Sequence, residues 1–320
     1  MMKQLLFFFL LFSISLQSQN YSKVDDLVSK YPRFTKVEDL ADKIAVDFSN
    51  EEDKVRAAFY WLSNNVRYNL KEFYNPKQRS YKFSYSSELE KEQKLQALKD
   101  KLVRNVFLTK TGVCEDYAQS FKKICDLLTI ESEVISGNVR SSYLEIGKPK
   151  KSTNHAWNAV KINNKWIILD ATWAAGYEMN GKWVKKFDNY FYNIPKEKIL
   201  KTHYPKDKLW MLRFGRMSLK EFYNQPIYGN ILLNSDIELV SPKSGIIEIK
   251  SSEVISIKFK NLQKKISVYY NYNNQLYAKK PKIVVSEDIT ELKIKNPGKN
   301  TELFLFFESK PALQYKIKVK

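Results

Sequence analysis

The chain of 320 residues contains only two cysteines and two histidines, so thiol or imidazole chemistry can be placed at few positions. Cys114 lies in the stretch TGVCEDYAQSF, residues 111–121, directly after a Gly-Val pair and at the start of a predicted helix. Free backbone N–H groups and the positive dipole end of a helix favour a thiolate over a thiol there. The position of Cys114 therefore suits a nucleophile, provided that a base lies nearby.

His155 opens a segment that reads as a β-hairpin. Two alternating segments, residues 155–162 and 165–172, flank a two-residue Asn-Asn turn, which is typical of a tight hairpin. In this register His155 and Asp170 are diagonal neighbours on one face, about 7 Å apart at the backbone. A slip of one residue would move them to opposite faces of the sheet.

These three residues could form one catalytic site. A thiol nucleophile needs a base that holds its proton, and the base needs a partner that fixes its tautomer and stabilises the imidazolium. Cys114, His155 and Asp170 supply these groups. A buried His–Asp pair that only holds the hairpin is the alternative, and a cysteine at a helix start upstream argues against it.

The second cysteine has a different predicted role. Cys125 lies on the apolar face of the same predicted helix as Cys114. On a continuous helix the two Cα atoms lie about 16 Å apart, whereas a disulfide requires roughly 7 Å or less. We therefore expect no Cys114–Cys125 disulfide, and we expect Cys125 to be a small buried hydrophobe.

Two motifs resemble the core of the transglutaminase-like superfamily in order, spacing and flanking residues. They are GVCEDYAQSFKKIC, residues 112–125, and NHAWNAVKINNKWIILDATW, residues 154–173. The resemblance implies a papain-like arrangement with Cys114 as the nucleophile, His155 as the base and Asp170 as the orienting acid. Active members of this family act through an acyl-thioester intermediate.

The resemblance extends to the subgroup of kyphoscoliosis-type peptidases. Residues 53–70 and residues 188–214 resemble segments of that subgroup before and after the core. The downstream segment makes His203 a landmark of the subgroup, but not a catalytic residue. We expect His203 to pack or hydrogen-bond beside Pro205 and Trp210.

The resemblance implies cleavage or remodelling of amide bonds in protein or peptide substrates. Amine-dependent cross-linking is the alternative reaction, because the acceptor of the acyl group decides between hydrolysis and cross-linking. A catalytically inactive binding scaffold is the alternative from another class, and the intact catalytic residues argue against it. The oxyanion hole should include the Cys114 backbone N–H and a side-chain donor from residues 68–84. We expect no cofactor, and the two histidines leave little for a transition-metal site.

Residues 1–18 have the organisation of a secretory signal peptide. An early lysine, a short apolar run and small or polar residues follow one another in the order of such a signal. The apolar run is shorter than the roughly 20 residues that cross a bilayer, and no later stretch is apolar enough. The sequence therefore predicts a secreted, periplasmic or cell-envelope protein without a transmembrane segment after cleavage.

The formal charge of +19 at pH 7 limits the partners. The sequence contains no dense block of arginine and lysine with interleaved aromatic residues, so no nucleic-acid partner is expected. A protein or peptide substrate is expected, and the basic surface could also attract an anionic envelope polymer.

The spacing of apolar residues predicts an α+β fold with two domains. Residues 21–66 and 93–108 read as helices, with an irregular loop over residues 70–92. The catalytic domain, papain-like and transglutaminase-like, should span residues 19–227. Residues 228–320 contain short alternating runs separated by turn residues, which predicts an all-β sandwich of immunoglobulin-like size.

Overall fold

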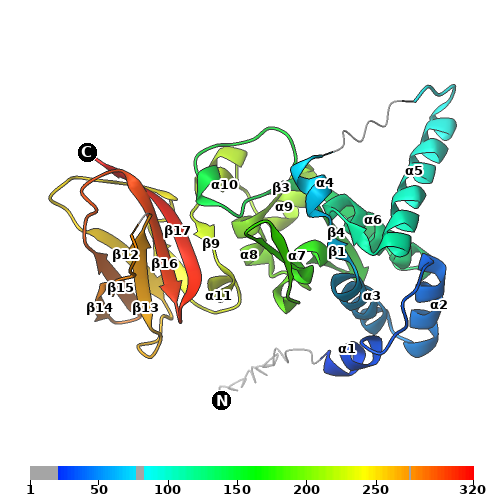
Figure 1. The fold of residues 1–320 in the computed structure, drawn as a ribbon, viewed down its shortest axis with the longest axis horizontal. Helices are drawn as coiled ribbons and strands as arrows, with labels where there is room; N and C mark the ends of the chain where they lie inside the picture. The colour runs from blue at the N-terminus through cyan, green and yellow to red at the C-terminus, as the bar shows by residue number, and fades with distance from the viewer. Residues whose placement is uncertain (1–20, 77–82, 274) are drawn as a thin grey trace, which may run out of the picture.

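The computed structural model of the chain describes residues 21–76, 83–273 and 275–320. An α/β region and a C-terminal β-rich region lie side by side (Figure 1), so the predicted mixture of helices and sheets is confirmed. The predicted signal peptide lies outside the described residues. Within the described ranges, every helix is too short or too polar to cross a membrane.

Three helices begin the described chain: α1 (Ser22–Val28), α2 (Val37–Asp47) and α3 (Glu51–Asn65). Helix α3 begins after Asn50, whose side chain accepts a hydrogen bond from the backbone N–H of Asp53 at 2.8 Å. Its apolar residues Val55, Phe59 and Leu62 are fully buried. The helical pattern of this part of the sequence is therefore confirmed.

The segment between α3 and Cys114 is more helical than predicted. Helix α4 (Leu70–Tyr74) lies within the stretch expected to be irregular, because Asn69 caps its first turn by accepting a hydrogen bond from Glu72. Helix α5 (Glu88–Thr109) begins before residue 93, because Ser87 caps it. These side-chain caps start helices in a segment where the spacing of apolar residues does not predict them.

Helix α6 (Cys114–Leu127) is the centre of the α/β region. Its buried face, which includes Tyr117, Phe121 and Ile124, joins the hydrophobic core of this region and packs against β3 and β4. Cys125 lies on this face with no exposed surface, and burial raises the pKa of its thiol to about 12. Both cysteines are free thiols, as expected, and Cys125 is the predicted small buried hydrophobe.

The sheet of this region has the strand order β5-β4-β3-β8 and is antiparallel throughout. Its strands are β3 (Ser132–Val139), β4 (His155–Ile162), β5 (Lys165–Leu169) and β8 (His203–Pro205). Strand β4 pairs with β5 through Ile162 opposite Lys165, which is the predicted hairpin register. The turn residues Asn163 and Asn164 have φ of 49° and 64°, as a two-residue hairpin turn of this hand requires.

The second strand of the hairpin ends earlier than predicted. It was expected to continue to residue 172, but β5 stops at Leu169 and Asp170 becomes the N-cap of α7 (Ala171–Ala175). The carboxylate accepts hydrogen bonds from the backbone N–H groups of Thr172 and Trp173, at 2.8 and 3.0 Å. Aspartate is a favoured N-cap residue, so a short helix replaces the end of the predicted strand from Asp170 on.

Short elements complete the α/β region and lead out of it. They are β1 (Arg67–Tyr68), β2 (Thr111–Gly112), β6 (Gly176–Met179), β7 (Lys182–Lys185), α8 (Lys196–Thr202), α9 (Lys208–Phe214), α10 (Leu219–Asn224), β9 (Ile227–Tyr228) and α11 (Asn230–Leu233). Strands β1 and β2 are parallel and pair Tyr68 with Gly112, just before Cys114.

The β-rich region consists of a four-stranded sheet and a five-stranded sheet around one hydrophobic core, and the fifth strand of the second sheet is β9, which pairs with β17. One has the order β10-β12-β15-β14, from β10 (Glu238–Ser241), β12 (Ile255–Lys260), β15 (Ile289–Ile294) and β14 (Lys282–Ser286). The other has the order β11-β17-β16-β13, from β11 (Ile246–Ile249), β17 (Lys310–Val319), β16 (Thr301–Phe307) and β13 (Val268–Tyr272). The predicted β-rich character of this region is confirmed, and the immunoglobulin-like sandwich stays a prediction.

The two regions are joined by backbone pairing, and a buried arginine fixes the segment that leads from the first region to the second. Strand β9 pairs with β17 through Tyr228 opposite Leu313. The guanidinium of Arg140 donates to the backbone carbonyl of Gln225 at 2.8 Å, and burial lowers the pKa of Arg140 to about 10. The domain boundary between residues 227 and 228 stays a prediction.

Candidate active site

Cys114 is the first residue of α6, as the sequence predicts. The backbone N–H of Val113 donates to the Asp116 carboxylate at 2.8 Å, which fixes the turn into the helix. Gly112 is required two residues before Cys114, because a Cβ there would lie 2.7 Å from the Cβ of Asp116. The Cys114 side chain is a free thiol with partial exposure, as a nucleophile needs.

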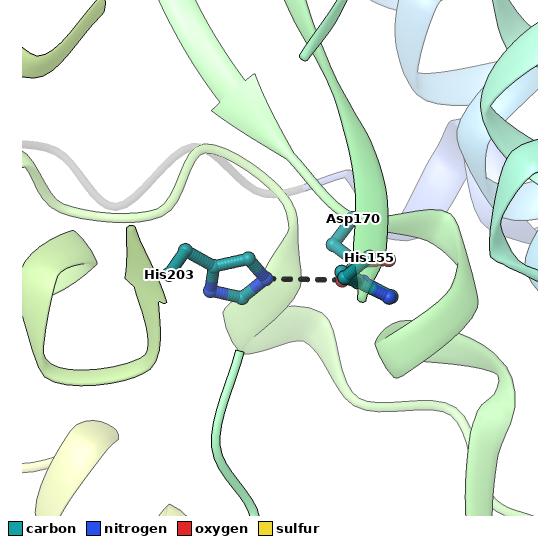
Figure 2. A group of neighbouring side chains, drawn as sticks. All are labelled: His155, Asp170 and His203. Atoms are coloured by element: carbon teal, nitrogen blue, oxygen red, sulfur yellow. Dashed lines mark hydrogen bonds and ion pairs between the residues drawn. The ribbon is translucent and has the colours of Figure 1, made fainter. Parts of the chain in front are cut away.

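His155 and Asp170 meet as the hairpin register predicts, although Asp170 lies on a helix cap. His155 Nε2 lies 2.6 Å from Asp170 Oδ2, and both side chains are buried (Figure 2). A carboxylate only accepts, so Nε2 carries the proton and donates it. This leaves Nδ1 as the ring nitrogen that can serve the thiol of Cys114.

Burial and charge act in opposite directions on the pKa of His155. Desolvation disfavours the imidazolium, but the charge of Asp170 and the hydrogen bond to it outweigh burial. The nearby side chain of Cys114 adds to this, and together these groups raise the pKa of His155 to about 10.

His203 has a role in the site that the sequence did not indicate. It was expected beside Pro205 and Trp210, but its Nε2 lies 3.1 Å from Asp170 Oδ2 (Figure 2). Its Nδ1 lies 2.7 Å from the hydroxyl of Thr202. Burial lowers the pKa of His203, so the ring is neutral, with Nε2–H donating to Asp170 and Nδ1 accepting from Thr202.

Strand β3 brings the two histidines together, because it lies between β4 and β8. Gly137 of β3 pairs with His155 on one side and with Pro205 on the other. A Cβ on Gly137 would lie 2.2 Å from the carbonyl oxygen of Tyr204 and 2.4 Å from the ring of Trp157. The close approach of β8 to the site therefore requires glycine at this position.

The carboxylate of Asp170 accepts four hydrogen bonds. The backbone N–H groups of Thr172 and Trp173 donate to Oδ1, and both histidines donate to Oδ2. Burial alone would raise the pKa of Asp170, but His155 and then His203 outweigh it and hold the pKa well below the usual range. Asp170 is therefore a charged acceptor at neutral pH.

Two indole rings enclose this cluster. The ring of Trp157 lies 6.1 Å from His155 and 4.9 Å from His203, centroid to centroid, and the ring of Trp173 lies 5.8 and 4.9 Å from them. Aromatic walls keep water out and lower the local dielectric constant, which strengthens the interaction of His155 with Asp170.

Among the described residues of the 68–84 segment, Tyr68 lies beside the proposed nucleophile, because it pairs with Gly112, two residues before Cys114. Burial first, then the nearby charges of Cys114 and Asp170, raise the pKa of Tyr68 well above its usual value. The phenol is therefore protonated and can donate. Its ring stacks on Trp183, with centroids 5.4 Å apart and planes at 29°.

His155, Asp170 and His203 also form a cluster in which one ligand atom of each lies within 4.8 Å of the others. Two ligands of a tetrahedral zinc ion, each about 2.1 Å from the metal, are about 3.3 Å apart. The separation of 2.6 Å between His155 Nε2 and Asp170 Oδ2 is shorter and is that of a charge-assisted hydrogen bond. The geometry therefore favours shared protons over a shared cation.

The region that carries these residues has recognisable relatives. The sequence profile of the transglutaminase-like superfamily matches residues 38–171. Kyphoscoliosis peptidase of Homo sapiens is 20% identical over 238 residues, which cover 73% of this chain and 33% of the peptidase. Hillarin of Drosophila melanogaster is 24% identical over 148 residues, 42% of this chain and 18% of Hillarin. The chain thus spans about a third or less of the length of these relatives.

Two solved structures are similar to part of the chain, at low TM-scores. A crystal structure of a TGase covers 57% of this chain and 40% of its own, with 18% identity and a TM-score of 0.30. A putative cysteine protease from Cytophaga hutchinsonii covers 46% of this chain and 42% of its own, with 22% identity and a TM-score of 0.25.

Proposed function

We propose that this chain is a cysteine-dependent acyl-transfer enzyme of the transglutaminase-like superfamily, and the match of residues 38–171 to that superfamily supports the proposal. Its proposed substrates are amide bonds of proteins or peptides. The observation that carries the proposal is the buried His155–Asp170 pair, 2.6 Å apart, together with the partly exposed thiol of Cys114 at the start of α6. Cys114 is the proposed nucleophile, His155 the acid and base, and Asp170 the group that orients it.

The proposed reaction has two steps. In the first, the Cys114 thiolate attacks the carbonyl carbon and forms the S–C bond, while the C–N bond breaks and the nitrogen takes the proton from Nδ1 of His155. In the second, His155 takes a proton from water and the water oxygen attacks the thioester. The carboxylic acid then leaves, and the thiolate and imidazolium are restored.

The oxyanion would form between two donors. The backbone N–H of Cys114 and the hydroxyl of Tyr68 lie near each other. A substrate carbonyl oxygen that enters between them would accept from both groups, and the protonated phenol would stabilise the negative charge that develops. Tyr68 is therefore the proposed side-chain donor of the oxyanion hole.

His203 is a positioning residue in this proposal. Its neutral Nε2–H donates to the oxygen of Asp170 that also accepts from His155. The donor stabilises the Asp170 carboxylate and holds it in the plane that suits the His155 imidazole. His203 touches no reacting atom, so it acts only through Asp170.

Hydrolysis is the proposed outcome, because water can serve as the acceptor of the acyl group without a dedicated amine site. Amine-dependent cross-linking is the second reaction of the same thioester. An inactive binding scaffold would not need a buried, charged Asp170 with four hydrogen bonds, because burying a charge is costly. Peptide libraries incubated with and without a primary amine, and analysed by mass spectrometry, distinguish hydrolysis from cross-linking.

The first experiment measures the alkylation rate of Cys114 with iodoacetamide between pH 5 and 9. The wild type should react at one site per chain, faster than a free thiol at the same pH. His155→Ala should slow the rate about tenfold or more, and Cys114→Ala should abolish it. Cys125→Ala is the matched control and should react like the wild type, because Cys125 is buried. A Cys114 that reacts no faster than an ordinary thiol would refute the proposed nucleophile.

Export is the proposed route of this protein, on the basis of the composition of residues 1–18. Expression of the full chain in a host with a secretory pathway, followed by N-terminal sequencing, tests it. The expected product begins near residue 19 and is found outside the cytoplasm. An uncleaved chain that retains Met1 in the cytoplasm would contradict the proposal.

A further inference from the structure

A recess of about 440 Å³ lies on the α/β region, outside the site described above. It is formed by the carboxyl ends of α3 and α5, by the start of β1 and β2, and by the segment between α1 and α2. Its lining residues are Arg33, Asn64, Asn65, Arg67, Thr109, Lys110 and Thr111. Three of the seven are cationic and none is acidic, so we call it the cationic recess.

The two arginines of the cationic recess are not neutralised. Among the residues that the structure describes, neither Arg33 nor Arg67 has a side-chain hydrogen bond or an ion pair. By contrast, Arg56 pairs with Asp25 at 2.6 Å, and Arg140 donates to backbone carbonyls. The two guanidiniums therefore have donors left over for a ligand.

Lys110 has a different role at the floor of the cationic recess. Its ammonium donates to the carbonyl oxygens of Phe107 and Phe34, and so closes the carboxyl end of α5. Burial, and then the charge of Arg33, lowers the pKa of Lys110 to about 8. The carboxyl ends of α3 and α5 carry partial negative charge, which offsets part of the positive charge of the cationic recess. The remaining positive charge comes from Arg33 and Arg67, and none of the lining residues is acidic.

We propose that the cationic recess binds the phosphate group of a larger molecule. Arginine forms paired N–H···O bonds to the oxygens of phosphate, and two guanidiniums around one hollow match the charge of a dianion. A carboxylate would neutralise only one of them. The volume exceeds that of a single phosphate, so part of the molecule that carries the phosphate enters as well.

The cationic recess and Cys114 lie on opposite sides of the β1–β2 ribbon. Arg67 and Tyr68 are consecutive in β1, and consecutive side chains of a strand point to opposite faces. Tyr68 faces the backbone of Cys114, so Arg67 points away from it. A phosphate can therefore bind while Cys114 is blocked, and the inference holds whether or not the chain is an enzyme.

Isothermal titration of the full-length protein with inorganic phosphate, at constant ionic strength, tests the inference. One phosphate should bind per chain, before and after Cys114 is alkylated. Arg33→Ala/Arg67→Ala should weaken binding about tenfold or more, since each charged hydrogen bond accounts for at least that factor. A second titration with polyphosphate distinguishes a polymer, which should bind more tightly, from a single phosphate group.

The matched control removes the same charge elsewhere. Arg104→Ala/Arg216→Ala changes two exposed arginines outside the cationic recess and should leave the phosphate affinity unchanged. Circular dichroism and thermal unfolding confirm that both double variants fold. Wild-type affinity in the Arg33/Arg67 variant, or an equal loss in the control, would overturn the inference and reduce the effect to general surface charge.

Discussion

The two regions of this protein differ in the polar groups that they bury. In the β-rich region the buried side chains of the described residues are apolar or tyrosine, apart from Thr290. The α/β region buries charged and titratable groups, among them Arg56, His155, Asp170 and His203. Buried charge is costly unless it is paired, so a chain that needs only stability avoids it. The contrast places the buried His155, Asp170 and His203 of the proposed site in the region that buries charge.

The contrast also separates two kinds of sensitivity to mutation. A substitution in the β-rich core should lower the free energy of unfolding without changing the reactivity of Cys114 in the folded protein. A change in the hydrogen bonds of Asp170 should lower reactivity more than stability. Four predictions test this difference, from the largest expected effect to the smallest.

Asp170→Asn should lower the turnover of an amide substrate about 10³-fold or more, because an amide cannot stabilise the imidazolium of His155. Asparagine still caps α7, so the protein should remain folded. Steady-state kinetics and thermal unfolding measure the two effects. Loss of folding without a specific loss of turnover would assign Asp170 to structure alone.

Phe307→Ala should lower the free energy of unfolding by about 3–5 kcal/mol, because the ring is fully buried against Phe259. The alkylation rate of Cys114 in the folded variant at 25 °C should equal that of the wild type. Urea unfolding and iodoacetamide kinetics provide the two measurements. A slower alkylation in the folded state would mean that the regions are coupled.

Acid should destabilise the α/β region through Asp170. Its folded pKa is lowered, so its contribution to stability is present above the unfolded pKa near 4 and is lost as the pH falls below that value. One proton accounts for a slope of at most about 1.4 kcal/mol per pH unit. Urea unfolding between pH 2 and 5 should show this slope in the wild type and a smaller one in Asp170→Asn. Equal slopes would contradict the assignment.

His203→Gln should lower turnover about tenfold and move the acid limb of the pH–rate profile to higher pH. Loss of the neutral donor raises the pKa of Asp170, so the carboxylate is protonated at a less acidic pH. A structural role alone would lower stability without moving the limb. His203→Asn, with a shorter donor, serves as the comparison variant for the same profile.

Local patterns predicted part of this site and missed the part that depends on long-range packing. The hairpin register placed His155 against Asp170, because a two-residue turn fixes which residues pair. The predicted end of β5 was wrong, because the alternation of apolar and polar residues cannot show that an aspartate caps a helix. His203 reaches Asp170 only because β8 pairs with β3, far away in sequence. No local pattern contains that pairing.

The same limit applies to Tyr68 and to the cationic recess. Tyr68 meets Cys114 through the two-residue pairing of β1 with β2, which is too short to predict from alternation. Arg33 and Arg67 lie in different segments and become neighbours of one hollow only in the folded chain. The helices, the position of Cys114 at a helix start and the hairpin follow from the sequence, and the contacts between distant segments require the structure.

The reactivity of Cys125 can report the local unfolding of the protein around α6. The thiol has no exposed surface on the inner face of α6, whereas Cys114 on the same helix is accessible. In the native state a thiol reagent should therefore count one sulfur per chain, and after full unfolding two. The slow appearance of the second sulfur under native conditions would time the excursions in which α6 separates from the sheet, without any added label.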